Sequence, residues 1–317
     1  MKFGTNSKGW TVVDGGDGAS LCAVSVKTSV RNDERPQVLA VAEMPGSDIQ
    51  LDAATLRSLM SRVDRSLPVL TTLARSQYQL RVMPEPAVPQ REMLASLRWS
   101  LSTEGDSPLE DFNLAWMRIP TEELLPARPR QVYAVMTPTA PLNARLATLR
   151  LAGVRPKVVD IRETALRNIA GALERAGESV ALVSADAEGV GMTFTYQGSL
   201  YLDRHMDPPP VSEPEAADSA ARAQLHERAG MQLLRSIDVI GRSYPFMSVE
   251  RVVVAAAPET LGLCEFLTAQ LPLKVEPLDL NQVFDLSKVP ELAQSPALQA
   301  RCLVPLGAAL RGARAAP

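Results

Sequence analysis

The sequence predicts an α/β protein made of two similar halves that face each other across a ligand cleft. Short apolar runs, which are typical of strands, alternate with longer segments whose apolar residues recur at helical spacing. A strand followed by a hairpin occurs twice, once after Gly9 and again after Ser179, and helices and further strands follow each copy. Pro84, Pro86 and Pro89 mark a boundary at the end of the first copy.

The composition excludes several classes of function. The chain has 317 residues, of which 46% are apolar, enough for one large domain or two ordinary ones. Its net charge of -3 comes from interspersed acids and bases, without the basic stripe that nucleic acid binding needs. Cys22, Cys264 and Cys302 are far apart in the sequence, so we expect reduced core residues instead of disulfides or a metal site.

No apolar run approaches the ~20 residues that span a bilayer, and the N-terminal segment lacks the apolar stretch of a secretory signal. We therefore expect a cytosolic protein, held at a membrane only through a partner.

The first copy begins with an antiparallel meander. Three apolar runs separated by turn-forming residues predict its strands over residues 10–13, 20–26 and 38–43. A helix is predicted over residues 52–66, because Asp52 suits an N-cap and the following apolar residues recur at helical spacing. Residues 78–83 predict another strand.

After the prolines, the pattern predicts two helices and two strands. Pro89 suits the first turn of a helix, and a later helix stops at Gly153. The predicted helices cover residues 91–101 and 142–152, and the predicted strands cover residues 112–119 and 131–137.

The second copy follows the same plan. Strands are predicted over residues 154–161, 179–184, 249–259 and 273–280, and a hairpin with a Gln197-Gly198 turn over residues 191–204. Helices are predicted over residues 162–176, 216–242, 261–271 and 295–311. The acidic, proline-rich residues 205–216 predict a solvated loop.

Several segments resemble, in order, the PilM family of type IV pilus assembly proteins, and within it the MshI branch of mannose-sensitive haemagglutinin (MSHA) pili. They are "VPQREMLASLRWSL", "DSPLEDFNLAWMRIP", "LRLAGVRPKVVDIRETALRNI", "VERVVVAAAPETLGLCEFLTAQL" and "VPLGAALRG", and together they span nearly the whole chain.

The resemblance implies an actin-like fold related to FtsA, with two duplicated RNase H-like halves around a nucleotide cleft and a small α+β subdomain inserted in the first half. The first half would be residues 1–83 plus the C-terminal helix at about 295–311. The insert would be residues 84–156, and the second half residues 157–294, including the loop 205–216.

The resemblance also implies a partner. Members of this family lie in the cytoplasm and bind the short cytoplasmic tail of a PilN-like inner-membrane protein. For this chain, the residues we suggest for partner binding are Arg98, Trp99 and Trp116 of the insert, with packing as the alternative role.

Actin-like ATPases hold phosphates between two hairpin turns, using backbone N–H groups, an Asp at each strand end that organises the metal, and a Lys in the first hairpin. By resemblance, Asp14, Gly16 and Gly18 lie in the first of these turns, but the lysine position holds Leu21. The missing cation would weaken phosphate binding by an amount on the order of a few kcal/mol.

The other two nucleotide motifs also depart from the family pattern. Ser184 stands at the position of the second Asp, and Asp186 replaces a glycine, where it is at best a shifted metal ligand. In the third motif, Ala256 and Ala257 replace a glycine pair, and Pro258 removes an N–H donor.

We therefore expect a pseudo-ATPase scaffold with no catalytic residue, no resident cofactor and no metal. The alternative is an ATP-binding switch that uses Asp14, Gly16, Gly18 and Asp186 for ATP and magnesium. The glycine-rich loop after Asp14 has two possible roles: a hairpin turn, which we favour, or a weak anion site. Neither His205 nor His226 belongs to a sequence pattern of His, Cys, Asp or Glu at metal-ligand spacing.

Overall fold

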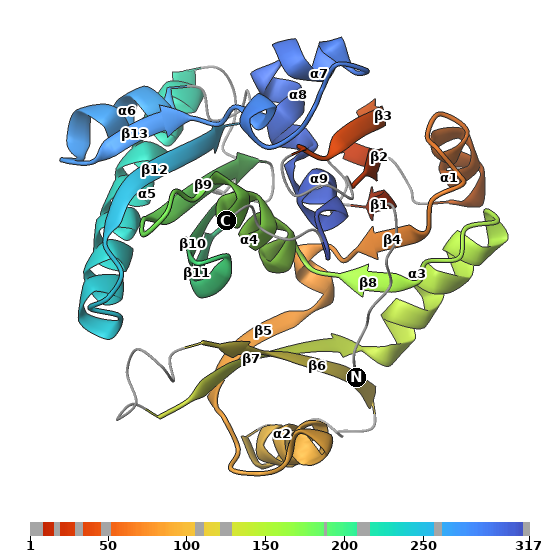
Figure 1. Ribbon diagram of the computed structural model, residues 1–317, viewed down its shortest axis with the longest axis horizontal. Coiled ribbons are helices and arrows are strands. Elements are labelled where there is room, and N and C mark those ends of the chain that lie inside the picture. Colours follow the sequence, from red (N-terminus) through yellow and green to blue (C-terminus); the bar gives the residue numbers. More distant parts are fainter. Residues whose placement is uncertain are drawn as a thin grey trace.

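The computed structural model describes residues 9–15, 20–28, 34–45, 52–104, 111–120, 129–186, 189–207, 216–256 and 262–312. These residues form two five-stranded sheets with the same internal order, and a separate three-stranded sheet that lies below them in Figure 1. Each large sheet has an antiparallel meander on one side and two parallel strands on the other. The predicted duplication of the α/β unit is confirmed.

The first large sheet has the order β3-β2-β1-β4-β8. Its strands are β1 (Gly9–Gly15), β2 (Ser20–Lys27), β3 (Gln37–Pro45), β4 (Val69–Thr72) and β8 (Val158–Asp160). The predicted meander is confirmed. Strand β4, which runs parallel to β1, was not predicted, because four residues after a proline carry no distinguishable period.

The second large sheet has the order β11-β10-β9-β12-β13. Its strands are β9 (Ser179–Asp186), β10 (Gly189–Tyr196), β11 (Ser199–Met206), β12 (Val249–Ala256) and β13 (Lys274–Pro277). The predicted hairpin turn is confirmed: Gln197 and Gly198 both have positive φ, 51° and 70°, which a two-residue turn of type I′ requires.

The small sheet has the order β5-β7-β6 and carries helix α2 (Met93–Glu104) on one face. Its strands are β5 (Gln79–Pro84), β6 (Phe112–Ile119) and β7 (Gln131–Pro138). It has an apolar core of its own, formed by Met83, Met93, Leu97, Leu101, Val132 and Ala134.

The pairing of strands corrects both boundaries expected for the insert. Strand β5 lies before the boundary at residue 83, yet it pairs along its length with β7 of the small sheet. Strand β8 lies after the boundary at residue 156, yet it pairs with β4 of the first large sheet. Helix α3 (Thr139–Leu151) packs its Leu149 into the core of that same sheet, with Val13 and Leu56. The prolines mark a bend in the chain, whereas the hydrogen-bond partners determine to which sheet each strand belongs.

The remaining helices are α1 (Ala53–Met60), α4 (Arg162–Leu173), α5 (Ala216–Ser243), α6 (Leu263–Gln270), α7 (Pro290–Gln294), α8 (Pro296–Arg301) and α9 (Leu303–Ala309). Asp52 caps α1 as predicted, accepting a hydrogen bond of 2.7 Å from the Thr55 N–H. The helix predicted over residues 295–311 divides at Cys302 into α8 and α9. Pro305 lacks the N–H that would continue the ladder to Arg301. Most of the predicted loop 205–216 lies outside the described residues.

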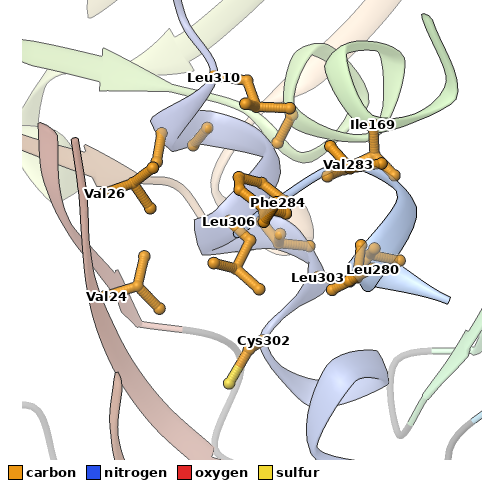
Figure 2. Packing of buried hydrophobic residues seen from close by; sticks show 14 of the residues in the cluster. Val24, Val26, Ile169, Leu280, Val283, Phe284, Cys302, Leu303, Leu306 and Leu310 are labelled. Atoms are coloured by element: carbon orange, nitrogen blue, oxygen red, sulfur yellow. The ribbon is translucent and has the colours of Figure 1, made fainter. Parts of the chain in front are cut away.

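The two large sheets are joined by α4 and α9, which lie between them (Figure 1). Helix α4 packs on β9, β10 and β11, and α9 packs on β1, β2 and β4. The helices approach so closely that a Cβ on Gly307 would lie 2.2 Å from the Ala165 carbonyl oxygen. Figure 2 shows the apolar residues around α9, where Leu303, Leu306 and Leu310 belong to one cluster with Phe284, Ile169 and Val26. One continuous core therefore serves both large sheets.

Candidate functional site

The candidate site lies at the ends of the two central strands, β1 and β9, which are third in their sheets. Asp14 is the penultimate residue of β1, and Asp186 is the last residue of β9. Burial raises the pKa of Asp14, and the charge of the Asp186 carboxylate raises it further. Of the four residues suggested for nucleotide binding, these two lie at corresponding strand ends of the two large sheets. Gly16 and Gly18 lie outside the described residues.

Asp14 is held by the neighbouring strand β4. Its Oδ1 accepts a hydrogen bond from Thr72 Oγ1. This hydrogen bond and the charges of Arg145 and Arg162 lower the pKa of Asp14, but burial outweighs them and the pKa stays above the ordinary value. The Asp14 carboxylate therefore sits in a site that disfavours its ionised form.

Arg145 of helix α3 is a site residue that the sequence analysis missed. It is buried, and its Nη2 donates to the Thr72 carbonyl oxygen at 2.7 Å and to Thr71 Oγ1 at 3.2 Å. The sequence did contain a signal. Arg145 shares the inward face of the predicted helix with Leu142 and Leu149, where a charged side chain is out of place.

Arg162, the first residue of α4, is the second missed residue. Its Nη2 lies 2.6 Å from Asp186 Oδ2 and 3.2 Å from Ser184 Oγ, and the residue is only 7% exposed. A positively charged side chain in the first turn of a helix is unfavourable, because the N-terminal end of the helix dipole is also positive. That unfavourable placement, directly after the strand ending at Asp160, was the available signal.

The backbone opposite Ser184 leaves room for this arginine. Gly191 on β10 is the cross-strand partner of Ser184. A Cβ added to Gly191 would lie 2.9 Å from Ser184 Oγ and 4.0 Å from Arg162 Nε. A larger residue at position 191 would therefore push against both side chains.

The position suggested for a phosphate-binding lysine is apolar. Leu21 is buried in a cluster with Val13, Ala23 and Leu56. Its side chain is part of the core of the first sheet and offers no cation to the site. Ala256 is the last residue of β12, while Ala257 and Pro258 lie outside the described residues.

The described donors do not fit the magnesium ion that an actin-like nucleotide site implies. Magnesium is held through carboxylate oxygens, with near-ideal octahedral geometry. One oxygen of Asp186 is engaged by a guanidinium, and Asp14 has a raised pKa and a hydroxyl donor on its Oδ1. The arrangement is that of an internal ion-pair network.

The three residues suggested for partner binding lie on the small sheet and its helix, away from Asp14 and Asp186. Arg98 Nη1 donates to the Phe112 carbonyl oxygen at 3.0 Å, which ties α2 to β6. Trp116 is half-buried, and the Arg118 guanidinium lies 5.7 Å from its ring centroid. Trp99 is 68% exposed on α2. Of the three, Trp99 has the surface that a partner can reach.

Other chemistry is sparse in the described part of the chain. No group of three or more His, Cys, Asp or Glu side chains is arranged there to hold a metal ion. His205 Nε2 lies 3.7 Å from Asp207, and His226 is buried beside Phe266. Among the described helices, none combines the length and apolar character needed to span a membrane.

No protein-family model and no curated protein sequence matches this chain. Among solved structures, the chain is similar to one of a PilM–PilN type IV pilus biogenesis complex, with 21% identity and a TM-score of 0.73. That match covers 95% of this chain and 97% of the other.

Two weaker likenesses have TM-scores of 0.47. One is to the cytoplasmic domain of EpsL, an inner-membrane component of the Vibrio cholerae type II secretion system, with 15% identity over 78% of this chain and 81% of that one. The other is to a protein of unknown function with an actin-like ATPase fold from Bacteroides thetaiotaomicron, with 12% identity over 93% of this chain and 99% of that one.

The fold expected from the sequence is therefore confirmed. Two duplicated halves with the same strand order, joined by a central pair of helices and accompanied by a small third sheet, match a PilM structure over nearly the full length of both chains. The chain has the α/β fold of that PilM structure.

Proposed function

We propose that this protein is a scaffold of type IV pilus assembly that binds the cytoplasmic segment of a PilN-like inner-membrane protein. The observation that carries the proposal is the likeness of 95% of the chain to a structure of the PilM–PilN complex, at a TM-score of 0.73. Binding of this kind would hold the protein at the cytoplasmic face of the inner membrane. The sequence segments quoted above favour the MSHA system and its MshI branch.

The proposed scaffold is a pseudo-ATPase. Leu21, which is buried in the core of the first large sheet, stands where the family's first hairpin has its phosphate-binding lysine. The Arg162 guanidinium forms an ion pair with the Asp186 carboxylate. These features remove the cation that would contact the phosphates and engage a carboxylate that would organise the metal. A scaffold, unlike an ATPase, needs neither a phosphate-binding cation nor a metal-binding carboxylate.

The partner surface that we propose consists of the exposed residues of helix α2 and the edge strand β5 of the small sheet. Trp99 and Leu94 of α2 are 68% and 47% exposed, and Val82 on the edge strand β5 is 50% exposed. An edge strand can pair with an extended peptide, and a large aromatic side chain is a common anchor in such interfaces.

Peptide binding tests this proposal. A fluorescent peptide copying the cytoplasmic N-terminus of the membrane protein encoded next to this one is titrated with the full chain, and anisotropy is measured. We expect saturable binding that Trp99→Ala weakens by about tenfold or more, as for other buried aromatic anchors. Leu151→Ala is the matched control, because Leu151 is 73% exposed on α3. Absence of binding at high protein concentration would refute the scaffold proposal.

The alternative function, an ATP-binding switch, is favoured by one observation: Arg145 and Arg162 are both buried, and the charges of both lower the pKa of Asp14. Thermal melts with millimolar Mg-ATP separate the two functions, because a ligand that binds only the folded state raises the midpoint. We expect no rise. A rise that Asp14→Ala abolishes would instead support the switch.

A further inference from the structure

Arg162 lies where the two halves of the molecule meet. It begins α4, directly after Ile161 and the end of β8, so its backbone continues from the first large sheet. Its side chain reaches Asp186 and Ser184 on β9, the central strand of the second large sheet. One side chain therefore links the strand end of one sheet to the strand end of the other.

The Arg162 guanidinium is buried and makes close contacts with specific partners. Nη2 is 2.6 Å from Asp186 Oδ2 and 3.2 Å from Ser184 Oγ, and the Arg162 side chain is 9% exposed. Gly191 supplies the space, since a Cβ there would lie within 4.0 Å of Arg162 Nε. A charge this deeply buried requires a paired countercharge, and Asp186, with a side chain 30% exposed, supplies it.

The same cation acts on the carboxylate of the other half. Arg162 lowers the pKa of Asp14, together with Arg145, against the larger opposite effect of burial. Asp14 therefore senses the charges of Asp186 and of both arginines, although burial keeps its own ionised form disfavoured. Two carboxylates brought together in a partly buried site need positive charge between them. A protein side chain already provides it.

We propose that the Arg162 guanidinium is a built-in cation of this site, which holds the strand ends of the two halves together in the place of a bound divalent metal. The proposal deepens the pseudo-ATPase part of the proposed function and rests on it. It explains how the carboxylates Asp14 and Asp186 can stay together without nucleotide. It also makes Arg162 the residue that excludes the metal.

Removal of the guanidinium should therefore create a metal site. The probe is Mn²⁺ alone, followed by the electron paramagnetic resonance signal of the free ion in the presence of the full chain at neutral pH. We expect wild-type protein and Arg162→Lys to leave Mn²⁺ free. Arg162→Gln should bind about one Mn²⁺ per chain, at least about tenfold more tightly than wild type, because the site then has one positive charge fewer beside its two carboxylates. The double variant Arg162→Gln with Asp186→Asn should lose this binding.

Two results would overturn the proposal. One is an Arg162→Gln variant that keeps the wild-type circular dichroism spectrum but binds no more Mn²⁺ than wild type. The other, which needs no folded variant at position 162, is a wild-type protein that itself binds Mn²⁺ in a manner abolished by Asp14→Asn. Neither readout involves the peptide, so failure of peptide binding would count against the scaffold and leave this result standing.

Discussion

At the residue scale, Asp14 is a carboxylate whose neutral form is favoured in the folded protein. Burial raises its pKa above the value of 3.8 that an unperturbed Asp has. Its contribution to stability is therefore fully present below the unfolded-state pKa and is lost as the pH rises through the folded-state pKa. At neutral pH the ionised side chain destabilises the fold, although it is balanced in part by Thr72 and the two arginines.

We expect Asp14→Asn to raise the thermal midpoint at pH 7 by a few degrees, roughly what about 1 kcal/mol gives in a chain of this size. The advantage should shrink as the pH falls toward acid, because wild-type Asp14 then takes up its proton. Thermal melts across pH 4 to 8 check this. A variant that melts below wild type at pH 7 would contradict it.

Asp52 provides a control of opposite sign. The Thr55 backbone N–H, which donates to its carboxylate, holds the pKa of Asp52 below the usual value. Its contribution is therefore present at neutral pH and lost as the pH falls through the folded-state pKa. Asp52→Asn should lower the midpoint at pH 7, with a difference that narrows in acid.

The residues of the site show what a sequence can and cannot reveal. Asp14 and Asp186 were suggested by the resemblance to the nucleotide motifs of actin-like proteins. Arg145 and Arg162 were missed, because their role depends on which strand ends lie beside them, and only the fold determines that. Cys22 and Cys302 are a similar case: they are distant in the sequence, yet their Sγ atoms lie 3.3 Å apart as buried free thiols.

At the element scale, the crossing of α4 and α9 depends on a glycine. We expect Gly307→Ala to destabilise the protein by about 1–3 kcal/mol, the usual range for overpacking, because its Cβ would lie 2.2 Å from the Ala165 carbonyl oxygen. Urea unfolding measures the change. Backbone atoms, unlike side chains, cannot turn aside to relieve such a contact.

Gly241→Ala is the matched control for this substitution. Gly241 lies in helix α5, and nothing comes within 4 Å of an added Cβ there. Since alanine favours a helix over glycine by up to about 1 kcal/mol, this variant should be neutral or more stable. Equal losses in the two variants would show that the α4–α9 contact is not specially tight.

Elements with a strong local signal were predicted well. The Gln197-Gly198 hairpin and the Asp52 cap are set by the backbone preferences of a few adjacent residues. Strand β4 was missed and β5 was assigned to the wrong sheet, because the pairing partners of a short strand are far away in the sequence. The break at Cys302 was readable in principle from Pro305.

At the scale of the whole molecule, the described residues contain a large core shared by both halves, further apolar clusters in each of the two large sheets, and a separate small core under α2. Because the small core can open while the large one stays intact, the free energy of opening the small core should be lower than the free energy of global unfolding. We expect the amides of α2 to exchange hydrogen at least about tenfold faster than those of α4 and α9. Native-state hydrogen exchange read by mass spectrometry measures this. Equal protection of α2 and α4 would mean that all three sheets unfold as one unit.

The two ends of the described chain meet. Trp10 Nε1 on β1 donates to the Arg311 carbonyl oxygen at 3.0 Å, and α9 covers β1 and β2. Strands β1 and β2 are therefore made well before α9, the helix that covers their apolar face. At a synthesis rate of about 5–20 residues per second, the interval between them is on the order of tens of seconds. During translation, the apolar face of this sheet stays exposed until α9 has been made and has emerged from the ribosome.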